Sequence, residues 1–210
     1  MKKYFIPAFI ALILSMVSCN GKDEESVGSM FSGFVTAYTD GNGLISMVKD
    51  DMGNEYAITG CSDVLIPDTI YRYVVSMGLD ENSTAHIIQK VTPLYGAVKA
   101  PETSILPDTL KKQDPVQINA AYIGGGFLNI TMGIKIQQDS KMHSLLYARM
   151  SDEDQLTFTV YHDAHGDTPM YTMYAYLSIP LKDYGISRND TVFLKCKGYQ
   201  EDCNMKLIYR

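Results

Sequence analysis

The sequence has no tryptophan, and it contains only four cysteines and four histidines among 210 residues. Few histidines mean few general bases, and no serine lies in the Gly-x-Ser-x-Gly pattern of a nucleophile elbow. No Cys-x-x-Cys pair and no Cys/His spacing typical of structural zinc occurs. These absences argue against a serine hydrolase of that type and against a zinc-finger module, and no motif predicts a cofactor.

Clusters of basic residues are missing as well. No cluster is longer than Lys111-Lys112, and 18 basic residues stand against 24 acidic ones, a formal net charge of −6. A protein that binds phosphate backbones needs a basic face. Anionic lipid head groups make the same demand. The sequence therefore predicts no nucleic-acid partner, and any membrane attachment has to come from something other than protein charge.

No apolar run is long enough to span a bilayer well, because a spanning helix needs about 20 apolar residues. The N-terminal run, Phe5 to Val17, follows two lysines and ends just before Ser18-Cys19. This pattern resembles a bacterial lipoprotein signal peptide, although Met16 stands where such signals usually have leucine. We expect residues 1–18 to be removed and Cys19 to carry the lipid. The alternatives are an ordinary secretory signal and an uncleaved anchor helix.

Residues 19–29 form an acidic tether. Its triplet Asp23-Glu24-Glu25 resembles the export signal that sends Bacteroidetes lipoproteins to the outer face of the outer membrane, although a solvated tether has the same composition. Loss of Lys2 and Lys3 would leave 16 basic residues and a net charge of −8. The predicted location is the outer membrane, with the protein exposed at the cell surface.

Beyond the tether, alternation of apolar and polar residues dominates and predicts an all-β protein. Residues 30–92 fit a small five-stranded barrel of the OB type, with turn signals such as Asp50 to Asn54 between the strands. The predicted strands are Phe31–Thr39, Leu44–Lys49, Glu55–Thr59, Ile70–Met77 and Ala85–Thr92.

Residues 93–114 are the predicted linker, because four prolines from Pro93 to Pro115 interrupt any strand ladder. Tyr95 to Val98 could still pack as a short strand. Thr109 lies in this segment within Asp108-Thr109-Leu110, which resembles the O-glycosylation sequence of Bacteroidetes. Thr109 is therefore the candidate glycosylation site.

Residues 115–210 predict an antiparallel, Ig-like β-sandwich. In the second of its strands five apolar side chains, from Leu128 to Ile136, share one face, which is typical of a half-buried strand. Leu181 to Tyr184 predicts a single helical turn before Gly185. The predicted strands are Val116–Ile123, Phe127–Gln137, Ser144–Met150, Gln155–His162, Met170–Ile179, Val192–Tyr199 and Cys203–Tyr209.

Cys196 and Cys203 are the candidate disulfide pair. A turn centred on Tyr199-Gln200 would place them opposite each other, whereas a turn at Gln200-Glu201 would place Cys203 opposite Gly198. Because Tyr and Gln are poor turn residues, two buried free thiols are slightly favoured.

Several segments together resemble the NigD-like proteins of Bacteroidetes. Asp114-Pro115-Val116, Gly124 to Ile130 and Tyr161 to Asp167 resemble the C-terminal β-sandwich domain of that family. Gly33 to Thr36 and Asp50 to Tyr56 resemble the OB domain that precedes it. The resemblance implies a lipoprotein with a protein or peptide partner, and the family label suggests a role in bacteriocin immunity. It implies no catalytic residues. The glycines at 124–126 predict a loop entering a strand and not a phosphate loop, since no Lys-Ser/Thr follows them.

One loop carries side chains that could ligate a metal: His162, Asp163, His165 and Asp167. His162 also continues the apolar parity of its strand, and the residues after it suit a hairpin turn. The turn is the favoured interpretation, so we predict no metal and no catalytic residue.

Recognition of a partner is the favoured function. Fifteen tyrosines leave aromatic rings on faces expected to point outward, among them Tyr161, Tyr174 and Tyr176, which could contact a peptide or a sugar. The favoured alternative for these rings is packing against a neighbouring layer or domain. A metal-dependent envelope enzyme that uses the His162 loop, and a structural accessory of an outer-membrane complex, remain the other hypotheses.

Overall fold

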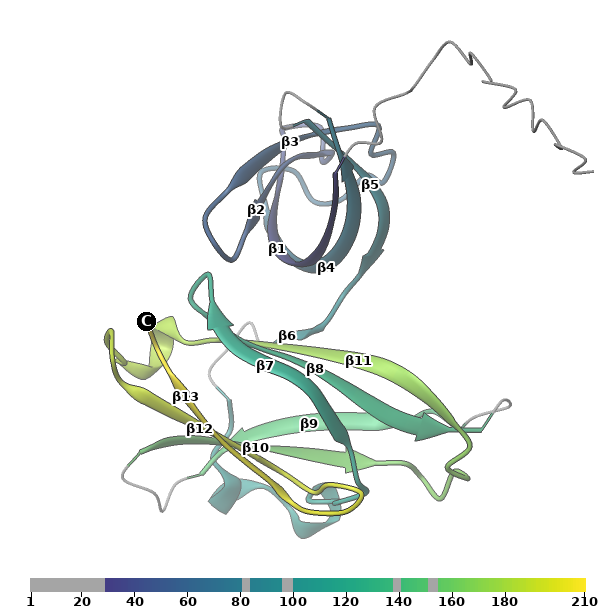
Figure 1. Cartoon of the computed structure of the whole chain (residues 1–210), viewed down its shortest axis with the longest axis vertical. Helices are drawn as coiled ribbons and strands as arrows, with labels where there is room; N and C mark the ends of the chain where they lie inside the picture. The colour runs from purple at the N-terminus through teal and green to yellow at the C-terminus, as the bar shows by residue number, and fades with distance from the viewer. Residues whose placement is uncertain (1–28, 81–83, 96–99, 138–140, 151–154) are drawn as a thin grey trace, which may run out of the picture.

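The computed structural model describes residues 29–80, 84–95, 100–137, 141–150 and 155–210, and these residues form a barrel followed by a sandwich (Figure 1). Within them the regular elements are strands and three short 3-10 turns, as the alternating sequence predicted. The all-β prediction is confirmed.

Five strands close the barrel in the order β1-β2-β3-β5-β4. Strand β1 pairs with both β2 and β4, and the β3/β5 pair is parallel, so the OB-like prediction is confirmed. Val35, Val48, Val75 and Met77 are fully or almost fully buried in its core. The strands are β1 Met30–Thr39, β2 Ile45–Asp50, β3 Glu55–Thr59, β4 Ile70–Leu79 and β5 Thr84–Val91.

Two four-stranded sheets form the sandwich, in the orders β13-β12-β10-β9 and β6-β11-β8-β7. Most pairs are antiparallel as predicted, but the β10/β12 and β6/β11 pairs are parallel. The strands are β6 Leu94–Tyr95, β7 Gln117–Gly124, β8 Phe127–Ile136, β9 Ser144–Arg149, β10 Leu156–Asp163, β11 Tyr171–Pro180, β12 Thr191–Cys196 and β13 Cys203–Ile208.

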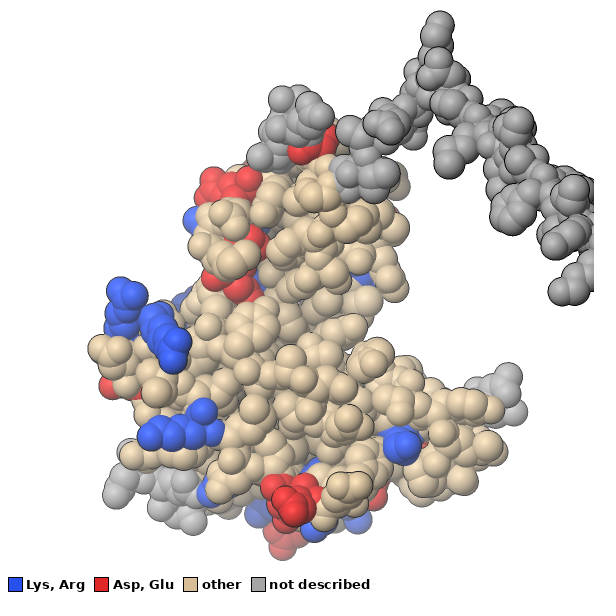
Figure 2. Space-filling model, in the orientation of Figure 1, with Lys and Arg blue, Asp and Glu red and all other residues tan. Residues whose placement is uncertain are grey.

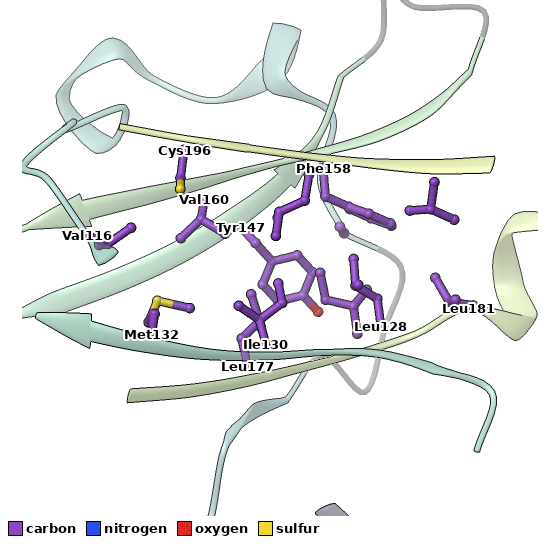
Figure 3. Packing of buried hydrophobic residues seen from close by; sticks show 14 of the residues in the cluster. Val116, Leu128, Ile130, Met132, Tyr147, Phe158, Val160, Leu177, Leu181 and Cys196 are labelled. Carbon is purple, nitrogen blue, oxygen red and sulfur yellow. The ribbon is translucent and has the colours of Figure 1, made fainter. Parts of the chain in front are cut away.

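The sandwich core lies between the facing sides of the two sheets (Figure 3). Leu128, Ile130 and Met132 are fully buried on the predicted face of β8, and Phe158 contributes the largest fully buried side chain. Each such side chain contributes about 1.5–3 kcal/mol when it leaves water. The predicted helical turn is the 3-10 turn η3 Lys182–Tyr184, which ends at Gly185 with a φ of 65°.

The segment predicted as a linker packs against the sandwich. Strand β6 adds to β11, while Pro101 and Lys112 accept backbone hydrogen bonds from Arg149 and His162. The 3-10 turns η1 Thr103–Ile105 and η2 Asp108–Leu110 lie between these contacts. This part of residues 93–114 is therefore fixed to the sandwich and is not a free spacer.

A buried ion pair of the barrel makes hydrogen bonds to the sandwich. Arg72 of β4 contacts Asp51 at 2.6 Å, and the two side chains are 2% and 8% exposed. The same guanidinium donates to Asn129 Oδ1 of β8 at 2.9 Å and to Ser178 Oγ of β11 at 3.1 Å. Because Asn129 and Ser178 are fully buried, the outer face of this sheet is covered by the barrel here and is not open to solvent.

Glycines let the two domains approach closely. A Cβ atom at Gly124 would lie 2.8 Å from Asp51 Cβ, and one at Gly125 would lie 2.6 Å from Asp51 Oδ1. Gly125 and Gly126 have φ values of 60° and 84°, which confirms a loop that needs glycine. The loop before β8 is therefore also a docking surface for the barrel.

Replacing Arg72 with methionine would leave Asp51 as a buried carboxylate without its cation. Breaking a buried ion pair in this way costs about 3–5 kcal/mol. We expect Arg72→Met to uncouple the domains, so that urea denaturation followed by tyrosine fluorescence and circular dichroism shows two transitions.

The matched control is Lys49→Met, which removes an exposed ion pair with Glu55 in the same barrel. Because exposed ion pairs contribute little to stability, it is expected to have a much smaller effect than Arg72→Met. Equal effects of the two substitutions would contradict the assigned role of Arg72.

Candidate functional site

The predicted lipidation site, Cys19, lies outside the described residues, as do the rest of the signal segment and most of the tether. No helix among the described residues is both long and apolar enough to cross a membrane. The described chain begins at Ser29, whose carbonyl accepts a hydrogen bond from Leu79 at the barrel end away from the sandwich (Figure 1).

The three candidate tyrosines occupy different environments. Tyr161 is only 5% exposed, so the expectation that it is an outward contact is wrong. Tyr176 is half-buried, with its ring 6.1 Å from Phe34 of the barrel. Tyr174 is 58% exposed and is the one of the three that is free to contact a partner.

Tyr174 and Tyr176 line a groove of about 550 Å³ at the edge of β11, which we call the edge groove. Figure 2 shows the molecule hollowed between barrel and sandwich beside this strand, with uncharged residues around the hollow. The volume falls within the range of ligand sites. The lining residues are Val91–Pro93, Ile134, Ile136, Lys141–His143, Leu145 and Met173–Tyr176.

Two of the four candidate loop residues are brought together, through a third residue that the sequence did not indicate. His143 Nδ1 lies 2.9 Å from His162 Nε2, and His143 Nε2 lies 3.1 Å from Asp167 Oδ2. The side chains of His143 and Asp167 are each 4% exposed. Pairing of Leu145 with His162 across β9 and β10 brings His143 to this position.

The other two candidates lie outside this array. Asp163 Oδ1 accepts the backbone N–H of His165, and His165 Nε2 lies 3.0 Å from Ser144 Oγ. Within the described ranges, no three or more His, Cys, Asp or Glu side chains converge in a geometry that would hold a metal ion. The loop is instead a turn in which His165 and Gly166 adopt positive φ values of 49° and 70°.

Burial, together with the neighbouring His143, lowers the pKa of His162 below its usual range. The backbone N–H of Gln137 and the His143 ring lower the pKa of Asp167. His162 Nδ1 lies 3.3 Å from the Pro115 carbonyl oxygen, which can only accept a hydrogen bond. The array ties three chain segments together.

The two candidate disulfide cysteines lie opposite each other, Cys196 on β12 and Cys203 on β13. This is the register that a turn centred on Tyr199-Gln200 would give. Both are free thiols, and a hydrogen bond between them raises the pKa of Cys196 and lowers that of Cys203 to about 7.

Thr109, the candidate glycosylation site, is exposed within η2. Its modification stays a prediction.

The sequence did not indicate the junction residues Arg72, Asp51 and Asn129. Each lies in a strand or turn where a polar residue is common. The alternation of apolar and polar residues therefore predicts that their side chains face solvent. The signal that could have found the contact is the Gly124-Gly125-Gly126 run, because consecutive glycines often mark a close approach of two backbones.

Comparison with known structures shows the same fold in proteins of Bacteroides and Parabacteroides species. A NigD-like immunity protein from Bacteroides caccae superposes with a TM-score of 0.69 at 24% identity, covering 85% of this chain and 91% of that one. A putative toxin-related protein from Parabacteroides distasonis gives 0.67 at 17% identity, with 87% and 94% covered.

A putative lipoprotein from Bacteroides fragilis gives a TM-score of 0.60 at 9% identity, covering 87% of this chain and 99% of that chain. Comparison with curated protein sequences finds no match. At these identities the likeness establishes the fold.

The family follows from the sequence of the sandwich itself. The profile of the NigD-like C-terminal beta sandwich domain matches residues 99–209, which is more than half of the chain and includes the 101–113 segment that packs on β9 and β10. The chain therefore belongs to the NigD-like family.

Proposed function

We propose that the protein is a lipid-anchored, non-catalytic binding protein of the bacterial envelope, held through Cys19 and exposed at the cell surface, with an immunity-type role. The observation that carries the proposal is the edge groove, where the exposed Tyr174 lies beside an apolar hollow between two rigidly joined domains. The NigD-like family and the immunity and lipoprotein descriptions of its structural neighbours support it.

The geometry of the chain favours display of the groove away from the anchor. The described chain starts at the barrel end opposite the sandwich, and the hydrogen bonds of Arg72 to Asn129 and Ser178 hold the sandwich at the other end. A lipid at Cys19 would therefore hold the barrel near the membrane and the groove farther out.

The second hypothesis is a metal-dependent enzyme, and the residues that bear on it are the hydrogen-bonded array of His143, His162 and Asp167. Its side chains are almost completely buried and satisfy one another. A catalytic group has to reach its substrate, so this array fits a structural role better. The third hypothesis is a structural accessory of an outer-membrane complex. The identity of the protein crosslinked to position 174 distinguishes that role from binding of another partner.

Lipid attachment is tested by Cys19→Ser. Metabolic labelling with an alkyne fatty acid is expected to label the wild type and not this variant, which should be released from the membrane fraction. Cys61→Ser is the matched control because Cys61 is a half-buried thiol of the barrel, and it should remain labelled. Labelling of Cys19→Ser at the wild-type level would contradict the anchor.

Partner binding is tested by placing a photocrosslinking phenylalanine analogue at Tyr174 in cells with an intact envelope. We expect a reproducible crosslinked protein from this position. The control position is Ile208, an exposed apolar residue on the edge strand β13, which should give none. An integral outer-membrane protein as the product would favour the accessory hypothesis, and no specific product would contradict the binding role.

The enzymatic alternative is tested by measuring bound zinc in the wild type and in His162→Ala. We expect no stoichiometric zinc in either protein. His162→Ala should lose about 1–3 kcal/mol of stability, because it leaves a buried ring nitrogen of His143 without its partner. One zinc per wild-type chain that is lost in His162→Ala would overturn the non-catalytic proposal.

A further inference from the structure

The outer edge of β11 is only partly occupied. Strand β6 pairs with it at Leu177 and Ser178, whereas among the described residues no strand pairs with that edge from Tyr171 to Tyr176. On its other side β11 pairs with β8 along its whole length. Alternate backbone N–H and C=O groups of about six residues therefore face outward, over roughly 20 Å of strand.

The edge strand of the other sheet, β9, is likewise paired over only part of its length. Near Arg149 the segment that begins at Pro101 pairs with β9. The Arg149 N–H donates to the Pro101 carbonyl, and Arg149 forms a β-bridge with Glu102. Among the described residues, no strand pairs with the outer edge of β9 from Ser144 to Leu146. The chain thus closes one half of this side of the sandwich with its own extended segment and leaves the other half open.

The edge groove occupies that open half. It is lined by Met173 and Ala175, which lie on the face of β11 that is turned toward the sandwich core. It is also lined by Tyr174 and Tyr176, which lie on the opposite face of the strand. One cavity can touch both faces of a strand only if it runs beside the strand's edge. Leu145 at the start of β9 borders the same cavity from the opposite sheet, so its width spans the gap between the two sheets.

We propose that the edge groove binds an extended peptide segment of a partner protein, which adds to β11 as a strand in line with β6. The proposal rests on the binding role proposed above and names the chemistry of the partner. Backbone groups of the peptide pair with Tyr171 to Tyr176. Alternate side chains enter the apolar space beside Met173, Ala175 and Leu145, and the others lie against Tyr174 and Tyr176.

Charge selects the peptide further. Among the described residues that line the groove, Lys141 is the one Lys or Arg, and no Asp or Glu accompanies it. Its Nζ donates to the carbonyl oxygens of His165 and Gly166, in the loop that leads into β11. The peptide is therefore expected to carry a carboxylate at the end that lies near Tyr171.

Strand β6 is the precedent within the molecule for this mode of binding. It is a short extended segment, it docks on the same edge through the same backbone groups, and the buried Pro93 precedes it. An added strand would occupy the next positions of the same edge and would continue a sheet that already exists. This continuity favours an extended peptide over a compact small molecule.

The test uses the folded protein from residue 20 onward and a panel of fluorescein-labelled hexapeptides. The peptides alternate Val, Ile, Leu or Phe with Thr and carry either Asp or Lys at one end. Fluorescence anisotropy is expected to show saturable binding, with at least threefold preference for Asp. A copy that is N-methylated at alternate residues lacks the backbone donors and should bind at least tenfold more weakly.

Two variants and one control locate the site. Met173→Asp and Tyr174→Ser change side chains that are 45% and 58% exposed, so both proteins should fold, and each is expected to raise Kd at least tenfold. Ile208→Asp places the same new charge on the exposed face of edge strand β13 and should leave Kd unchanged.

Three results would overturn the proposal: no panel peptide binds, the N-methylated copy binds equally well, or Ile208→Asp weakens binding as much as Met173→Asp. A dimer in analytical ultracentrifugation that Met173→Asp dissociates would assign the groove to a second copy of the chain instead. A specific crosslink from Tyr174 without peptide binding would leave the binding role standing and would remove only strand addition.

Discussion

The buried pair of Arg72 and Asp51 is the interaction on which the relation between the two domains depends. A guanidinium that is 2% exposed requires full compensation, and this one receives it from both domains. Asp51 and Thr36 come from the barrel, Asn129 and Ser178 from the sandwich, and the ring of Phe127 lies 4.2 Å away. Separation of the domains would leave these buried groups unpaired, so the barrel and sandwich form one unit.

This constraint also shapes the edge groove. One wall of the groove is Val91–Pro93 at the exit of the barrel, and the other walls belong to the sandwich. The contact of Tyr176 with Phe34 holds β11 beside that exit. The groove therefore exists only while the barrel and sandwich stay in contact. Loss of the buried Arg72 hydrogen bonds would also remove the recognition surface.

The motifs that resemble the NigD-like family meet in pairs in the structure. Asp51, from the barrel motif, packs against Gly124 and Gly125 of the sandwich motif. Asp114 accepts the N–H of Ala164 and donates its own N–H to His162, which joins the other two motifs. Each motif is thus one half of a contact between distant segments, and this explains why the sequence showed them without showing their purpose.

Sequence reasoning succeeded where the cause of structure is local. Period-two alternation predicted β3 with its observed bounds and the buried face of β8, because burial on one side of a strand is recorded at every second residue. It failed at Tyr161, Asn129 and His143, because what covers or contacts each of these residues comes from a segment far away in the chain. Tyr174 was placed correctly as an exposed residue. The open edge beside it depends on where β6 begins, and the alternation of apolar and polar residues carries no such information.

The most direct measurement is hydrogen–deuterium exchange of the β11 backbone amides, with and without the partner captured from the envelope. We expect the outward-facing amides between Tyr171 and Tyr176 to exchange quickly in the free protein and to become protected in the complex, while those of β13 do not change. Unchanged exchange along β11 in a complex that is otherwise intact would contradict strand addition at this edge.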